Sequence, residues 1–486
     1  MVRLMIIKKS MSELIRLLER KEISSLELAK EHIKRIQSLN DIINAYITVN
    51  EKNLLEDAKL SDERRAKGAL LSKFDGIPIA IKDNIATKDI RTTCASKILE
   101  NFIPPYDATA YVRLKKMGFL TLGKTNLDEF AMGSTTETSY FGATRNPYNT
   151  GRVPGGSSGG SAAAVSAFMA PAALGSDTGG SIRLPAAFCG VVGIKPTYGR
   201  VSRYGLVAYA SSLDQIGTFG RSVDDAAALL AAISGRDPMD STSIESPVDF
   251  TPEEIAGDTR GMVIGVPEEY FTGVSEEIAV AVRKKISELE SSGARVENIS
   301  LRFTEYSIPV YYLIATAEAS SNLARYDGIK YGYTSPRASN LAELYTRTRS
   351  EGFGKEVKRR IILGTFSLSS GYYDAYYLKA LKARTLIIRD FTDAFSKVDV
   401  IVAPVSTTTA FKIGELIDDP LQMYMMDVLT TSANLAGIPA ISVPAGLDSA
   451  GLPIGVQIMA SHFGEKKLFA IARAMEKNSE TISPEI

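Results

Sequence analysis

Histidine and cysteine are scarce in this chain: 486 residues contain two of each. His32 and His462 stand apart from the glycine-rich segments described below, and neither neighbours a second candidate triad member, so we expect surface or structural roles for both. Cys94 and Cys189 lack the Cys-x-x-Cys or His-x-His spacing of zinc sites, so the sequence predicts no metal. A disulfide between them is the weaker interpretation, because no secretory segment precedes them.

An excess of charge of one sign is also missing. The 56 Lys and Arg residues balance 56 Asp and Glu residues, so no global field draws the chain to nucleic acid or to an anionic membrane. The sequence has no run of 18 apolar residues and no apolar stretch long enough for a signal peptide. We therefore expect a cytoplasmic protein without direct membrane contact.

Alternating strand-like and helical segments predict an α/β fold with a sheet covered by helices on both faces. Apolar runs predict strands at 76–82, 119–123, 191–195, 262–266, 399–405 and 440–445, and helical patterns span 222–233 and 276–292. We expect a single domain over residues 1–486, with an outer helical region at 1–60 and a strand-free helical region at 304–395 that shapes the substrate site.

Two glycine- and serine-rich stretches lie close together: Val-Pro-Gly-Gly-Ser-Ser-Gly-Gly-Ser at 153–161 and Gly-Ser-Asp-Thr-Gly-Gly-Ser-Ile-Arg at 175–183. Such sequences turn sharply and expose backbone N–H groups beside hydroxyls, as attack on a carbonyl requires. A linker is the poorer interpretation, because a small-residue apolar run follows at once at 161–170. A phosphate loop needs Lys-Ser or Lys-Thr after its last glycine, where this chain has Ser161 and Ala162.

A serine nucleophile needs a base, and with histidine excluded the candidate is Lys82. It ends the apolar run at 76–82, where burial favours the neutral amine that accepts a proton. The alternative is an ordinary lysine at a strand end that extends into solvent.

These three segments together resemble the amidase signature family, whose motifs occur here in the same order and spacing. The resemblance implies an amidase-signature fold with a large mixed central sheet and a Ser-Ser-Lys triad. Ser181 corresponds to the nucleophile, Ser157 to the bridging serine, Lys82 to the base and Ser158 to a supporting serine. It also implies a cis peptide bond before Ser157. We expect the oxyanion to be held by backbone N–H groups of Thr178, Gly179, Gly180 and Ser181.

Outside the signature, segments 92–96, 123–132, 320–332 and 349–360 resemble one branch of that family, the A subunits of glutamyl-tRNA(Gln)/aspartyl-tRNA(Asn) amidotransferases. The resemblance implies a glutamine pocket formed by Tyr311, Arg360 and Asp427, with Arg359 as the alternative to Arg360. Core packing would also explain Tyr311, and a solvated helix face would explain Arg360. Asp427 is harder to dismiss, because a carboxylate among apolar neighbours is costly unless it is paired.

The same resemblance implies partners. It predicts a glutaminase that supplies ammonia to the amidotransferase B subunit, which would bind tRNA, ATP and Mg, with a small C subunit completing the complex. No cofactor is expected in this chain, and the acceptor, Glu-tRNA or Asp-tRNA, is left open. The alternatives are a free-standing amidase for small amides and a subunit that serves only as a non-catalytic scaffold.

Overall fold

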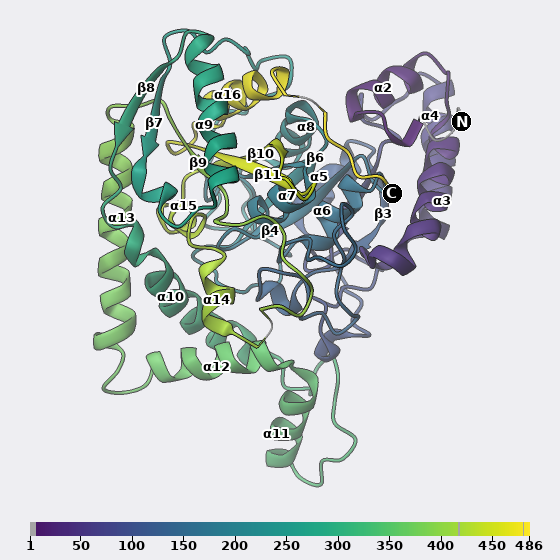
Figure 1. Cartoon of the computed structure of the whole chain (residues 1–486). Helices are drawn as coiled ribbons and strands as arrows, with labels where there is room; N and C mark the ends of the chain where they lie inside the picture. Colours follow the sequence, from purple (N-terminus) through teal and green to yellow (C-terminus); the bar gives the residue numbers. More distant parts are fainter. Residues whose placement is uncertain (1–5, 417, 480) are drawn as a thin grey trace.

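The centre of the structure, a computed structural model that describes residues 6–416, 418–479 and 481–486, is an 11-stranded sheet (Figure 1). Its strand order is β1-β3-β2-β4-β6-β5-β10-β11-β9-β7-β8. The sheet is mixed, because β2 runs parallel to β3 and β4, and β7 runs parallel to β8 and β9, while the remaining neighbours are antiparallel. The strands are β1 (Tyr46–Val49), β2 (Pro78–Lys82), β3 (Leu120–Thr125), β4 (Ala172–Asp177), β5 (Val192–Lys195), β6 (Gln215–Gly220), β7 (Val263–Pro267), β8 (Arg295–Ile299), β9 (Val400–Pro404), β10 (Ala440–Leu447) and β11 (Pro453–Ala460).

Helices surround this sheet and connect its strands. They are α2 (Met11–Glu19), α3 (Ser25–Ile43), α4 (Glu51–Ala66), α5 (Thr109–Lys116), α6 (Gly159–Ser166), α7 (Arg183–Cys189), α8 (Val223–Ile233), α9 (Glu276–Ser291), α10 (Ser307–Asn322), α11 (Leu341–Gly352), α12 (Lys355–Ser367), α13 (Lys379–Phe395), α14 (Pro420–Met425), α15 (Thr431–Ala436) and α16 (Glu465–Lys477). Short helical turns include η2 (Glu129–Ala131) and η6 (Asp374–Leu378).

Both faces of the sheet are covered, as the sequence predicted. Side chains alternate between the faces of a strand. Ile79 and Ile81 of β2 pack in one apolar cluster with α5, α8, α9 and α16, whereas Ala80 packs in another with α3 and α6. In β9, Val402 belongs to the first cluster and Ile401 to a third one with α10, α13 and α15. The α/β fold class with a mixed central sheet is therefore confirmed.

The six predicted strands and two predicted helices are present, with ends that shift by a few residues. Five further strands, β1, β4, β6, β8 and β11, were not predicted. β4 and β6 contain small and polar residues and are strands because they pair with each other and with β2 or β5. β8 is a partly exposed edge strand. β11 is buried throughout, and its apolar run could have been identified from the sequence.

The N-terminal region, predicted to be helical over residues 1–60, also contains a strand. α2, α3 and α4 lie on the outside of the sheet, but β1 between them pairs antiparallel with β3 and forms an edge of the sheet. Residues 304–395 contain α10 to α13 and no strand, and α11 projects from the body of the molecule (Figure 1). The single-domain assignment stays a prediction.

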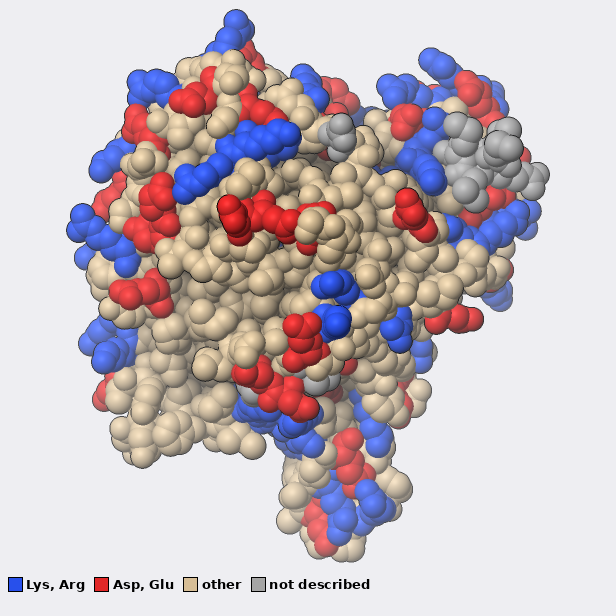
Figure 2. Space-filling view, viewed as in Figure 1, with Lys and Arg blue, Asp and Glu red and all other residues tan. Residues whose placement is uncertain are grey.

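The surface carries interspersed charges. On the face shown in Figure 2, Lys and Arg alternate with Asp and Glu, in keeping with the balanced composition. Among the described residues, no helix combines the length and the apolar character needed to cross a membrane.

Candidate active site

The three predicted catalytic segments meet at one edge of the sheet. Lys82 ends β2, and the loop after β4 leads to Ser181; because β2 and β4 are parallel, their carboxyl ends lie at the same edge. Ser157 and Ser158 immediately precede α6, and Ser158 N donates to the Ser181 carbonyl oxygen at 3.1 Å. The Gly156–Ser157 peptide bond is cis, as the resemblance implies.

Lys82 is fully buried among hydroxyl groups. Its Nζ lies 2.8 Å from both Ser157 Oγ and Ser158 Oγ, and 2.9 Å from Ser176 Oγ. Burial lowers the pKa of Lys82 to about 7, although three more distant carboxylates act in the opposite direction. At neutral pH a large fraction of this lysine is therefore the neutral amine, the form that can accept a proton.

Ser176 and Asn84 belong to this arrangement, and the sequence analysis did not single them out. Asn84 Nδ2 donates to Ser176 Oγ at 2.9 Å, and Ser158 Oγ donates to the Ser176 carbonyl oxygen at 3.0 Å. Ser176 lies within the quoted motif at 175–183, so its hydroxyl was visible in the sequence. Its proximity to Lys82 depends on the pairing of β2 with β4.

The loop that carries Ser181 is held by a buried carboxylate. Asp177 accepts hydrogen bonds from the backbone N–H groups of Gly180 (2.9 Å) and Ile182 (3.0 Å) and forms an ion pair with Arg183 at 3.2 Å. The Gly180 N–H is thus engaged and is not free for an oxyanion in this geometry. Gly180 therefore leaves the predicted set of oxyanion donors. The Thr178 hydroxyl donates to Asp214 at 2.7 Å.

Among the described residues, the backbone N–H groups of Thr178, Gly179 and Ser181 have no hydrogen-bond acceptor. No hydrogen bond joins the Ser157 and Ser181 side chains. Free donors beside a candidate nucleophile are what an oxyanion site needs. Hydrogen bonds between catalytic groups often tighten only when substrate binds. The roles predicted for these residues are therefore compatible with the geometry and stay predictions.

Tyr311 and Asp427 border the same loop. A methyl group added at Gly179 would lie 2.6 Å from Tyr311 Cζ, and one added at Gly180 would lie 3.4 Å from Asp427 Oδ1. Asp427 is buried and accepts a hydrogen bond from Ser134 Oγ at 2.6 Å, a contact that the sequence did not indicate. Burial raises the pKa of Asp427 to about 7, despite Ser134 and the charge of Arg360.

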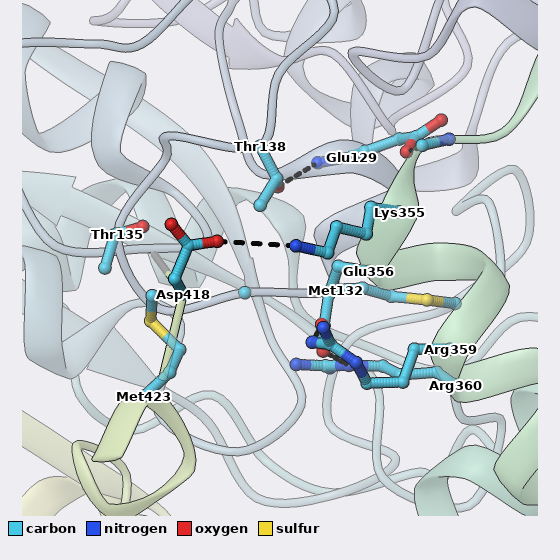
Figure 3. Close-up of a pocket in the computed structure, with 12 residues that line it drawn as sticks. Glu129, Met132, Thr135, Thr138, Lys355, Glu356, Arg359, Arg360, Asp418 and Met423 are labelled. Carbon is cyan, nitrogen blue, oxygen red and sulfur yellow. Dashed lines mark hydrogen bonds and ion pairs between the residues drawn. The ribbon is translucent and has the colours of Figure 1, made fainter. Parts of the chain in front are cut away.

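Arg360 is the buried member of the pair of arginines on α12. Its Nε donates to Glu356 Oε1 at 2.7 Å and its Nη1 donates to Tyr209 Oη at 2.8 Å. Arg360 Nη2 forms no hydrogen bond with the described residues. A ligand can therefore bond to one guanidinium nitrogen rather than to two. Arg359 pairs with the other oxygen of Glu356 and is partly exposed (Figure 3). Arg360 is therefore better placed than Arg359 to bind a carboxylate group of a ligand.

A cavity of about 410 Å³ adjoins these residues. α12 contributes Lys355, Glu356, Arg359 and Arg360, and the opposite wall contributes Met423 and Asp418, whose carboxylate lies 3.4 Å from Lys355 Nζ (Figure 3). Thr135, also in the wall, lies beside Gly156, because a methyl group on that glycine would be 2.5 Å from Thr135 N. The cavity thus borders the segment of Ser157 without being lined by the triad itself.

Among the described residues, the two histidines and two cysteines form no hydrogen bond with Lys82, Ser157 or Ser181, although Cys189 Sγ contacts the Pro154 carbonyl oxygen at 3.4 Å and the Cys94 N–H donates to the Asp83 carbonyl oxygen at 3.0 Å. His32 is buried, and burial lowers its pKa to about 3, whereas His462 is exposed, three residues before α16. Cys94 and Cys189 are buried free thiols. Within the part of the chain that the structure describes, no three His, Cys, Asp or Glu side chains are grouped as metal ligands would be.

Comparison with known proteins agrees with the geometry. The amidase family model matches residues 27–469. The chain is 56% identical over 472 residues to the glutamyl-tRNA(Gln) amidotransferase A subunit of Geobacillus thermodenitrificans, covering 97% of each chain. The crystal structure of the glutamyl-tRNA(Gln) amidotransferase A subunit from Thermotoga maritima is 46% identical, with a TM-score of 0.82 over 99% of this chain and 97% of that one. Native peptide amidase from Stenotrophomonas maltophilia is 30% identical, with a TM-score of 0.80 over 97% and 96%. The chain belongs to the amidase family.

Proposed function

We propose that this chain is the glutaminase subunit of a tRNA-dependent amidotransferase, hydrolysing glutamine through Lys82, Ser157 and Ser181. The observation that carries the proposal is the buried Lys82 amine, with a pKa of about 7, in contact with the Ser157 hydroxyl. The similarity to amidotransferase A subunits over 97% of the chain supports the choice of substrate.

The hydrogen bonds around Lys82 give its lone pair a direction. A neutral amine has two N–H donors and one acceptor site. The Ser158 hydroxyl donates its proton to the Ser176 carbonyl oxygen, so Ser158 Oγ can only accept from Lys82. Ser176 Oγ accepts from Asn84 and has a second lone pair for the other N–H of Lys82. With Lys82 donating to Ser158 and Ser176, its lone pair accepts the O–H of Ser157, the arrangement that the proposed relay uses.

The reaction follows from this relay. Lys82 takes the Ser157 proton as Ser157 takes that of Ser181, and Ser181 Oγ bonds to the side-chain carboxamide carbon of glutamine. The resulting oxyanion accepts hydrogen bonds from the Gly179 and Ser181 N–H groups, each worth about 3 kcal/mol in the transition state. The proton returns through Ser157 to the leaving nitrogen, ammonia departs, and water hydrolyses the acyl-enzyme to glutamate.

The two charged ends of glutamine have matching groups. Asp427 faces Gly180 and can receive the α-ammonium group, while Arg360 Nη2 can donate to the α-carboxylate. Tyr311 packs against Gly179 and closes the pocket beside the oxyanion donors. A small neutral amide lacks both charges and gains nothing from this clamp.

The ammonia acceptor is assigned to partner subunits. The B subunit would bind tRNA, ATP and Mg, and the small C subunit would complete the assembly, since this chain is charge-balanced. α12, which carries Arg360, also carries an exposed apolar patch that continues to η6 and suits a protein partner. The patch appears as an uncharged corner at the lower left of Figure 2 and comprises Ile362, Leu363, Phe366, Tyr372, Tyr373 and Tyr376.

The alternative is a free-standing amidase, which the likeness to peptide amidase keeps in consideration. The test compares glutamine with propionamide as substrates for the parent, Arg360→Gln and Asp427→Asn. We expect kcat/KM for glutamine to fall at least about tenfold in each variant, because each loses a charge-assisted contact worth about 1.5–3 kcal/mol. Hydrolysis of propionamide should change little.

Arg359→Gln is the matched control, because Arg359 is adjacent in sequence and partly exposed. It should retain glutamine hydrolysis near the parent level. Adding the partner subunits, ATP and misacylated tRNA should raise parental turnover. A parent that prefers propionamide, or an Arg360→Gln enzyme that loses both substrates equally, would favour the free-standing amidase. Parental activity that survives in Ser181→Ala would reject this triad.

A further inference from the structure

A second cavity lies at the opposite end of α6 from the catalytic serines. Its volume is about 270 Å³, and its walls include Ser166 at the end of α6, Arg221 just before α8, and residues 481–484. α6 begins directly after Ser158 and is eight residues long, so about 12 Å of helix separates this cavity from the triad. It is a site apart from the one described above.

Residues 481–484, near the C-terminal end of the chain, form part of the wall of this cavity. In Figure 1 the yellow trace leaves α16 and crosses toward α3. Arg35 of α3 holds it there, with Nη2 donating to the Ile486 oxygen at 2.6 Å. The cavity wall is thus built from segments far apart in the sequence and fixed by a hydrogen bond.

Two of the three guanidinium nitrogens of Arg221 have no hydrogen-bond partner. Its Nη1 donates to the Ile7 carbonyl oxygen at 2.9 Å, whereas Nε and Nη2 are buried and have no partner. Elsewhere in this protein Arg64 uses the same Nε/Nη2 edge to grip both oxygens of Asp75, at 2.7 Å each. Among the described residues no carboxylate lies within 4 Å of Arg221. This edge suits a carboxylate or a phosphate.

Two further residues of the cavity wall carry hydroxyl groups without partners. Ser166 Oγ and Tyr148 Oη, both in the cavity wall, are buried without a hydrogen-bond partner, and Ser166 is only 4% exposed. Buried polar groups without partners are costly and uncommon. Lys8 Nζ and Arg221 Cζ lie 5.2 Å and 5.5 Å from the centroid of the Phe168 ring, so two cations stand beside one wall.

Two carboxylates, Glu13 and Asp225, lie near these cations, but among the described residues neither forms an ion pair with Arg221 or Lys8. Glu13 also lines the cavity, but its oxygens are engaged by Lys9 at 3.2 Å and by Ser10 N at 2.9 Å. Asp225 Oδ1 accepts from Met11 N at 3.0 Å, whereas Asp225 Oδ2 is buried without a hydrogen-bond partner. Burial lowers the pKa of Arg221 to about 10, against the opposing effect of Asp225 and Glu13, so the guanidinium stays charged at neutral pH. Neither carboxylate lies within 4 Å of it.

We propose that this cavity binds a small organic oxyanion, a phosphate or carboxylate group on a compact apolar body. Arg221 Nε and Nη2 hold two oxygens of the anionic group, and Lys8, Ser166 and Tyr148 contact the remaining lone pairs. The cavity is larger than a phosphate ion, and Val165, Phe168, Val191 and Ile482 offer apolar walls for the body. A ligand of this kind satisfies every orphaned donor noted above.

The test is isothermal titration calorimetry of the full chain with phenyl phosphate, benzoate and inorganic phosphate at constant ionic strength. Saturable one-to-one binding of phenyl phosphate or benzoate is expected, and whichever binds more tightly identifies the anionic group. Inorganic phosphate should bind more weakly than phenyl phosphate, because it lacks the apolar body. Arg221→Gln should weaken binding by about 10- to 100-fold. Absence of saturable binding by both aromatic probes would overturn the proposal.

Two further variants keep the test decisive if Arg221→Gln does not fold. Lys8→Gln changes an exposed side chain, and Ser166→Val fills part of the cavity; each should weaken binding several-fold. Arg360→Gln, at the glutamine pocket, should leave it unchanged. Binding that persists in both Lys8→Gln and Ser166→Val, or that is lost in Arg360→Gln, would contradict the assignment. Binding by the chain alone that disappears in the assembled complex would assign the cavity to a partner chain instead.

Discussion

Replacement of Lys82 by arginine tests the proposed base most directly. An ordinary lysine, with a pKa of 10.5, is neutral in about one molecule in 3,000 at pH 7, whereas a pKa of about 7 makes half of the molecules neutral. Burial thus raises the fraction of competent base by about three orders of magnitude. Arginine keeps the charge but cannot release its proton near neutral pH. We expect Lys82→Arg to lower kcat for glutamine about 10²- to 10⁴-fold, as Lys82→Ala should.

The assay is ammonia release from glutamine between pH 5.5 and 9. Only the neutral amine accepts a proton, so the parental rate should rise about tenfold per pH unit below pH 7 and level off above it. Lys124→Arg is the matched control, because Lys124 is equally buried on the adjacent β3 and its pKa is lowered to about 8. Lys124 bonds to Ile85, Thr87 and Thr92 rather than to the catalytic serines.

Lys124→Arg should therefore share the structural cost of a buried guanidinium while keeping more activity than Lys82→Arg. Circular dichroism and thermal unfolding of both variants separate misfolding from loss of the base. A folded Lys82→Arg enzyme within a few-fold of the parent would refute the relay, as would a parental rate that is flat through pH 7.

Three other outcomes follow from contacts in the structure. Between pH 7 and 10.5 the unfolded chain binds more protons at Lys82 than the folded chain does, so the free energy of unfolding rises with pH over this range. Relative to Lys82→Met, the parent should gain about 3 kcal/mol of unfolding free energy from pH 7 to 9.5, measured by urea titration. Gly179→Ala places a methyl group 2.6 Å from Tyr311 Cζ and should lower kcat/KM for glutamine at least about tenfold; an unchanged value would mean that the pocket adapts freely. Asp177→Asn breaks the buried pair with Arg183 and should lower the urea-derived unfolding free energy by about 3 kcal/mol, whereas a loss below about 1 kcal/mol would contradict a structural role for the pair.

Most of the sheet was predictable where strands carry unbroken apolar runs. β2, β5 and β9 are buried throughout and follow such runs in the sequence. β4 and β6 could not be identified in this way, because glycine interrupts both segments and alanine and aspartate add to β4, and all three residues are depleted in strands. Their extended conformation comes from hydrogen bonding within the sheet, where β4 lies between β2 and β6.

At the site, the sequence by itself determined the residue types and motifs: two serines before a helix, a glycine-rich loop ending in Ser181, and Lys82 at the end of an apolar strand. It also excluded a histidine base. Each inference depends on local sequence, because turn chemistry and strand burial are properties of short segments.

Only the tertiary structure decided which of these groups touch and how they are tuned. The pairing of β2 with β4 brings Ser176 to Lys82, and burial of the amine lowers its pKa. Asp177 takes the Gly180 N–H, and Glu356 takes one side of Arg360, contacts that no spacing in the sequence indicates. Hydrogen-bond partners and desolvation depend on residues that are distant along the chain, so they are fixed only when the sheet and its covering helices assemble.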